Sequence, residues 1–137
     1  MSPFQSAAVQ ARFQAYPAAA RRDLLALREL VLDVARHTPG VGQIDGTLKW
    51  GEPAYLTPNG AGSTVRMDWK PKAPATYALY FNCRTTLVDT FRTLFPHDFA
   101  FEGNRALVFQ VGGRPPEDAL RLCVAAAFTY HARHRAR

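Results

Sequence analysis

Two short runs in the middle of the chain, residues 65–70 and 77–82, alternate apolar and polar side chains with a period of two. This alternation is typical of strands that bury one face. It places Met67 and Trp69 of the first run, and Phe81 of the second, in the core. The runs are short, sequential and linked by turn-forming residues. They therefore favour antiparallel pairing within one sheet.

Apolar stripes at helical spacing occur on both sides of these strands. Residues 24–35 carry the clearest stripe, and further stripes occupy residues 87–95 and 117–131. A shorter helix is expected before Pro17, which suits the first turn of the next helix. We therefore predict an α+β fold in which helices cover one face of an antiparallel sheet.

Length and composition indicate one ordinary globular domain. The chain has 137 residues, of which 47% are hydrophobic and 20% are charged. No apolar run approaches the ~20 residues of a membrane helix, and residues 1–10 lack a signal-peptide pattern. Cys83 and Cys123 form no disulfide framework. We therefore expect a cytoplasmic protein with reduced thiols and no membrane partner.

The positive charge is concentrated at the C-terminal end. Residues 131–137 hold Arg133, Arg135 and Arg137 without an acid, which is half of the net charge of +6. A solvated, frayed helix end accounts for this tail, and a phosphate-binding arm is the alternative. The rest of the chain is only mildly basic and shows no RNA-binding motif or recognition helix. We therefore do not expect nucleic acid as a partner.

Residues 46–56 read as a strand, a corner and a second strand. Gly51 permits a backbone conformation that a side chain would block, and Pro53 cannot donate to a strand ladder. Successive strand residues point to opposite faces, so Lys49 and Trp50 should lie on different sides of the sheet. On this interpretation Lys49 serves binding, whereas Trp50 packs against the helices and serves folding.

The sheet face away from the helices should be open, polar and mildly basic. Its cations could pair with a carboxylate or phosphate. The candidate ligand-binding residues on this face or at the turns beside it are Lys49, Trp50, Glu52, Tyr55, Arg66, Lys70, Tyr80, Asn82, Glu102 and Arg105. Two interpretations stay open: a solvated face with ordinary cross-strand pairs, or a binding surface for a small anion or a protein partner.

The chain predicts binding rather than catalysis. It contains no nucleophile elbow, phosphate-binding loop, zinc-protease motif or dinucleotide fingerprint. Cys83 precedes a predicted helix, but no His is near it in sequence to act as a base. His131 and His134 share a helix face, yet the neighbouring arginines disfavour a metal cation. We therefore assign no catalytic residue, metal ligand or cofactor.

Several short motifs follow one another along the chain. They are Leu48-Lys49-Trp50-Gly51-Glu52-Pro53, Trp69-Lys70-Pro71-Lys72, Tyr80-Phe81-Asn82-Cys83, Thr86-Leu87-Val88 with Thr90-Phe91-Arg92, and Phe101-Glu102-Gly103-Asn104-Arg105-Ala106. Together they resemble the YdhG-like family, a bacterial domain of unknown function, over about residues 16–130. The resemblance implies a single YdhG-like domain across residues 1–137, with a frataxin-like fold and a basic tail at residues 131–137. It implies no catalytic residues.

The resemblance also implies an alternative function, that of a frataxin-like iron chaperone. Frataxins present an acidic ridge on the first helix and its neighbour. Here the first two helices carry five arginines against three acids. Iron prefers clustered oxygen ligands, so this departure disfavours iron binding at that ridge. The glutamates Glu52 and Glu102 form a possible carboxylate pair if the fold brings them together.

Overall fold

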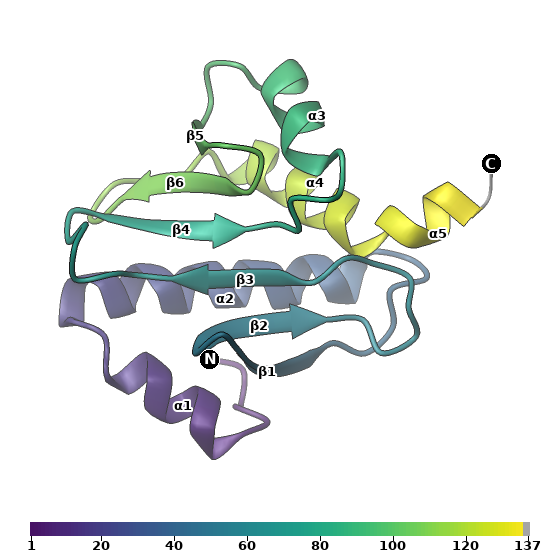
Figure 1. Cartoon of the computed structure of the whole chain (residues 1–137). Helices are drawn as coiled ribbons and strands as arrows, with labels where there is room; N and C mark the ends of the chain where they lie inside the picture. Colours follow the sequence, from purple (N-terminus) through teal and green to yellow (C-terminus); the bar gives the residue numbers. More distant parts are fainter. Residues whose placement is uncertain (136–137) are drawn as a thin grey trace.

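The computed structural model describes residues 1–135 and shows an α+β protein built on one open antiparallel sheet (Figure 1). The strands are β1 (Asp45–Lys49), β2 (Glu52–Leu56), β3 (Val65–Asp68), β4 (Thr76–Tyr80), β5 (Ala100–Glu102) and β6 (Ala106–Gln110). Their order is β1-β2-β3-β4-β6-β5. Neighbours in sequence therefore pair throughout, except that β4 pairs with β6 and leaves β5 at the edge.

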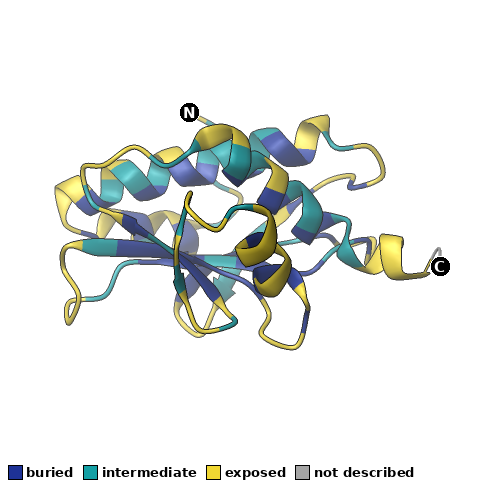
Figure 2. Cartoon of the chain, turned by 90° about the horizontal axis from the view of Figure 1, so that it is seen from above, coloured by how far each residue is buried: buried dark blue, intermediate teal, exposed yellow. Residues whose placement is uncertain are grey.

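Within residues 1–135, five helices accompany the sheet, and four of them contribute to its core. They are α1 (Ala7–Gln14), α2 (Ala18–His37), α3 (Leu87–Leu94), α4 (Glu117–Phe128) and α5 (Tyr130–Arg135). The large apolar side chains buried by α1 to α4 form one cluster with Met67, Phe81 and the other core-facing strand residues. In Figure 2, burial is concentrated in the strands and on the inner sides of the helices. Helices thus cover one face of the sheet, as the sequence predicts.

The opposite face of the sheet carries a much smaller buried cluster. It consists of Ala78, Tyr80 and Ala106, which lie side by side on β4 and β6. No helix side chain belongs to this cluster within residues 1–135. We refer to this side as the open face.

The structure differs from two sequence predictions, the burial of Trp69 and the single final helix. Phe81 is buried as predicted, but Trp69 is only partly buried, because its indole N–H reaches out to the carbonyl of Pro74. The predicted final helix is two helices, since it breaks at Thr129 and resumes as α5. The basic tail is therefore helical as far as Arg135, and Arg137 lies outside the described residues. No helix in the described part of the chain is long and apolar enough to cross a membrane.

The turn between β1 and β2 corrects the prediction for Trp50. Lys49 and Glu52 pair across the hairpin, and Trp50 and Gly51 form a two-residue loop with φ values of 57° and 75°. Positive φ at both loop positions is the type I′ geometry that suits the twist of a hairpin. Trp50 is therefore not a strand residue, and its side chain is 87% exposed. The prediction that Trp50 packs against the helices is wrong.

Candidate functional site

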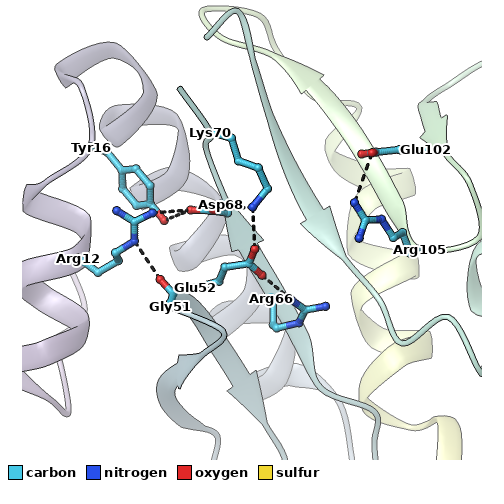
Figure 3. Close-up of polar contacts among 9 residues, drawn as sticks. All are labelled: Arg12, Tyr16, Gly51, Glu52, Arg66, Asp68, Lys70, Glu102 and Arg105. Carbon is cyan, nitrogen blue, oxygen red and sulfur yellow. Dashed lines mark hydrogen bonds and ion pairs between the residues drawn. The ribbon is translucent and has the colours of Figure 1, made fainter. Parts of the chain in front are cut away.

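Two buried carboxylates lie beside each other at one end of the open face. Glu52 begins β2 and Asp68 ends β3, and both are more than nine-tenths buried. Lys70 bridges them, with Nζ 2.9 Å from Glu52 Oε2 and 3.0 Å from Asp68 Oδ2. Arg66 donates from Nη1 to the other oxygen of Glu52 (Figure 3). Alternation along β3 produces this arrangement, because it turns Arg66 and Asp68 away from the core that contains Met67.

The N-terminal helices complete the arrangement from the side. Arg12 of α1 donates to Asp68 Oδ1 at 3.0 Å and to the carbonyl of Gly51 at 3.0 Å. Tyr16, between α1 and α2, donates its hydroxyl to the same Asp68 oxygen at 2.5 Å. We call Arg12, Tyr16, Glu52, Arg66, Asp68 and Lys70 the open-face network. It joins α1 to the β1–β2 turn and to β3.

Protonation in the open-face network follows from burial and charge pairing. Burial opposes the charged form of Lys70, but hydrogen bonds to Glu52 and Asp68 outweigh it and raise the lysine pKa above its ordinary value. For Tyr16, burial and the hydrogen bond to Asp68 act together and raise the phenol pKa. Lys70 therefore stays charged and Tyr16 stays neutral near pH 7. Two buried carboxylates tolerate this environment because each accepts from at least two donors.

Three cationic side chains surround the ring of Tyr80. Arg66 Cζ, Lys70 Nζ and Arg105 Cζ lie 5.5, 5.7 and 5.5 Å from the ring centroid. These distances are within the range of cation–π attraction. We call these four residues the Tyr80 cluster. It places three positive charges around one buried aromatic ring, whose pKa is raised by burial and lowered by Lys70, with a net upward shift.

A hollow of about 110 Å³ is lined by Lys70, Tyr80 and Arg105 of the Tyr80 cluster, but not by Arg66. Ala78 and Val108 contribute apolar surface to it, while Lys70, Lys72 and Arg105 supply positive charge. Asp68 and Glu102 supply the negative charge, so the balance of its lining is positive by one. A liquid water occupies about 30 Å³, so the hollow can hold a few waters or one small polyatomic ion.

The two guanidinium groups of the Tyr80 cluster are only partly used. Within residues 1–135, Arg66 donates from Nη1 alone, and Arg105 donates from Nη2 alone, to Glu102 at 3.4 Å. A guanidinium has five N–H donors, so most donors of both groups are available. Arg105 and Glu102 stand apart from the open-face network in Figure 3. Glu102 and Glu52 bind different cations, and the possible carboxylate pair is not formed.

The structure brings together only part of the predicted residue set. Tyr55 is in the core rather than beside the open face, and burial raises its pKa to about 12. Asn82 lies in the loop after β4, where its side chain accepts from the backbone N–H of Arg84. Lys49 is exposed at the end of β1 and makes no ion pair within residues 1–135. Trp50 is at the hairpin tip.

The sequence reading missed the contribution of the helices. Arg12 and Tyr16 are more than 50 positions from Asp68, and no local pattern links them to it. Asp68 was not among the candidate ligand-binding residues. The sequence did contain one signal for Asp68. It lies between Arg66 and Lys70 on the same strand face, where an acid should attract both cations.

Comparisons of this chain with protein-family models, with curated proteins and with solved structures found no match. The site must therefore be interpreted from its own chemistry. Among residues 1–135, no group of three or more His, Cys, Asp or Glu side chains is placed to hold a metal ion. The feature that the open face does offer is a set of positively charged donors around Tyr80.

Proposed function

We propose that the protein binds a small oxyanion, a carboxylate or a phosphate, in the hollow beside Tyr80. One observation carries the proposal: Arg66, Lys70 and Arg105 converge on the Tyr80 ring, and the donors of both guanidiniums are mostly unused. Three like charges this close repel one another. An incoming anion would relieve that repulsion and accept charge-assisted hydrogen bonds.

The buried carboxylates support binding by holding the cations in place. Glu52 forms ion pairs with both Arg66 and Lys70, so these two side chains lose little conformational freedom when an anion binds. Arg105 is the more open member, with a side chain that is 53% exposed and weakly paired. It would act as the side chain that closes on the ligand. The alternative of a protein partner would use the same cations against an acidic side chain.

We also propose that the chain is a YdhG-like domain with a frataxin-like arrangement. The α+β architecture, with N-terminal helices, a six-stranded antiparallel sheet and C-terminal helices, supports this proposal at the level of the overall plan. The motif around Trp50 forms the β1–β2 hairpin, and the motif at residues 101–106 forms the turn that carries Arg105. Both motifs therefore lie next to the open face.

Removal of Arg105 tests the anion proposal. Inorganic phosphate and succinate are titrated into the protein while amide chemical shifts and thermal stability are followed. Saturable binding should shift resonances near Tyr80 and raise the melting temperature. Arg105→Gln should weaken binding about tenfold or more, because hydrogen bonds to charged groups contribute about 1.5–3 kcal/mol. Lys49→Met should have a smaller effect, since β1 lies at the far edge from β6.

Arg36→Gln is the matched control for Arg105→Gln. Arg36 is 56% exposed and pairs with Asp33 at 3.5 Å, so the two arginines have similar surroundings, but Arg36 lies on the outer side of α2. The control should bind phosphate and succinate like the original chain. Equal weakening in both variants would reveal a general charge effect and would contradict a site at Tyr80.

The iron-chaperone alternative has its own test. The carboxylates of the open-face network already bind arginine and lysine, so they are poor candidates for iron ligands. Anaerobic calorimetry with Fe(II) should show no saturable site tighter than about 1 μM, which corresponds to about −8 kcal/mol. A tight stoichiometric site that disappears in Glu52→Gln or Glu102→Gln would replace the anion proposal with iron delivery.

A further inference from the structure

A second concave site, separate from the open face, lies between α3 and the two C-terminal helices. It has a volume of about 500 Å³, which is within the usual range of small-molecule sites. Leu94 and Leu122 both line it, and each is 62% exposed. Only two other large hydrophobic side chains in residues 1–135, Met1 and Trp50, are exposed, and neither lies here. The groove therefore collects apolar surface that the fold itself leaves open to water.

The two ends of this groove differ in chemistry. Tyr130 accepts the backbone N–H of Thr86 at 3.2 Å, which places α5 at the N-terminal end of α3. Leu94 is the last residue of α3, seven residues and about 11 Å along the helix from its first residue, Leu87. Leu122 lies two turns before Tyr130 along α4, at that same far end. One end is thus apolar, whereas the other presents Tyr130, Arg133 and His134.

The basic end is positive and already ordered. Among residues 1–135, no Asp or Glu lines the groove. Arg133 donates to Thr129 Oγ1 at 3.1 Å and to the carbonyl of Ala126 at 2.9 Å, so its guanidinium is held although the residue is exposed. The N-terminal end of α3 adds the positive end of its helix dipole at the same place. The hydroxyl of Thr90, which also lines the groove, donates to the carbonyl of Thr86 at 2.8 Å.

From this polarity we infer that the groove binds an amphipathic carboxylate, with its apolar chain along Leu94 and Leu122 and its carboxylate at Arg133. Charge complementarity decides between this occupant and an apolar cation, because Arg133 is positively charged and no Asp or Glu among residues 1–135 lines the groove. A carboxylate paired with a pre-ordered guanidinium forms charge-assisted hydrogen bonds. An apolar chain of about 11 Å covers both leucines. This binding is independent of the anion site at Tyr80.

Two probes with opposite head groups test the inference. Decanoate and decyltrimethylammonium are titrated separately, below their micelle concentrations, into the full chain by calorimetry. Decanoate should bind at one saturable site, and the ammonium compound should bind at least tenfold more weakly. The double change Leu94→Gln with Leu122→Gln should lower the affinity for decanoate about tenfold, because apolar burial is lost. Arg133→Gln should lower the affinity for decanoate and leave the affinity for the ammonium compound unchanged.

Arg135→Gln is the matched control, because Arg135 is on the same helix but donates to Gly60 and does not line the groove. It should bind decanoate normally. Equal affinity for the two probes, an unchanged Arg133→Gln variant, or no saturable binding would overturn the inference. A sedimentation experiment excludes another occupant: a dimer that dissociates in the leucine variants would assign the groove to a second copy. If the double variant does not fold, Leu122→Gln alone serves the same comparison.

Discussion

Trp50 has the least favourable backbone conformation in residues 1–135. It is the only non-glycine residue there with positive φ, and its large side chain gains almost no burial in return. Left-handed conformations cost ordinary residues about 1–2 kcal/mol. The hairpin tip is nevertheless held, because Arg12 donates to the carbonyl of Gly51 at 3.0 Å. The open-face network thus stabilises a turn that its own sequence does not favour.

Replacing Trp50 with Asn should therefore stabilise the protein. Asn tolerates positive φ and is preferred before Gly in type I′ turns, so we expect a gain of about 0.5–1 kcal/mol in the free energy of unfolding. Urea denaturation measures it. Trp50→Val, which is β-branched and poorly suited to positive φ, should lose stability. A less stable Trp50→Asn variant would show that the indole makes a contact that compensates for its backbone.

The Tyr16 hydroxyl predicts a distinct pH dependence. Its folded-state pKa is raised above the ordinary value of 10.0, first by burial and then by Asp68. The stabilisation is therefore complete below pH 10 and declines as the pH rises above it, because the unfolded chain loses the phenol proton first. Tyr16→Phe should be less stable than the original chain at pH 7, by about 1–3 kcal/mol, since Asp68 loses a donor.

Above pH 10 the stability difference between the original chain and Tyr16→Phe should narrow. Titrating groups that are distant from Tyr16 and share no partner with it are common to both chains and cancel in the comparison. Denaturant titrations at pH 7, 9 and 11 measure the difference. A gap that stays constant over this range would mean that the Tyr16 pKa is not raised in the folded protein.

At the scale of elements, the loop between β2 and β3 is fixed to the C-terminal helices. Ser63 donates its N–H to the carbonyl of Ala127 at 2.8 Å, and Ala132 donates to Ala61 at 2.9 Å. Gly62 lies between these two bonds. A Cβ at Gly62 would come within 2.3 Å of the Phe128 carbonyl oxygen, which is backbone and cannot move aside alone. The absence of a side chain at position 62 therefore allows the loop and α4 to meet.

Gly62→Ala should destabilise the protein by more than about 2 kcal/mol, because it separates the loop from α4. Gly60→Ala is the control in the same loop: its Cβ would meet open space, and only its positive φ resists substitution. That change should cost about 1 kcal/mol. Thermal and urea unfolding measure both variants. Similar losses in the two variants would show that the close approach at Gly62 relaxes easily.

Elements with a repeated pattern were the ones that sequence could predict. The stripe on α2 and the alternation in β3 and β4 locate the core, because burial imposes a period on many residues together. The prediction for the turn between β1 and β2 was wrong because no repeated pattern marks that turn. Alternation continues through Lys49 into Trp50, but the chain turns there, and a Trp-Gly turn lacks the usual Asn or Asp signal.

At the scale of the whole molecule, the candidate site depends on contacts that are distant in sequence. Arg66, Lys70 and Tyr80 could be predicted on the open face from strand alternation, whereas Tyr55 of the predicted set lies in the core. The pairing within the open-face network could not be predicted, because Arg12 and Tyr16 reach the sheet only after α1 has docked beside β1 and β2. Sequence therefore identified the charged surface but not the helix that organises it.

The strand order also has a consequence for how the chain is made. The meander β1-β2-β3-β4 needs only short loops, so it can close as soon as it leaves the ribosome. The next partner of β4 is β6, which follows only after α3 and β5. Until β6 is synthesised, β4 is an unpaired edge, although α2, a helix that contacts it, has already been made. Nascent chains that end before β6 therefore expose a strand edge at which they can pair with one another.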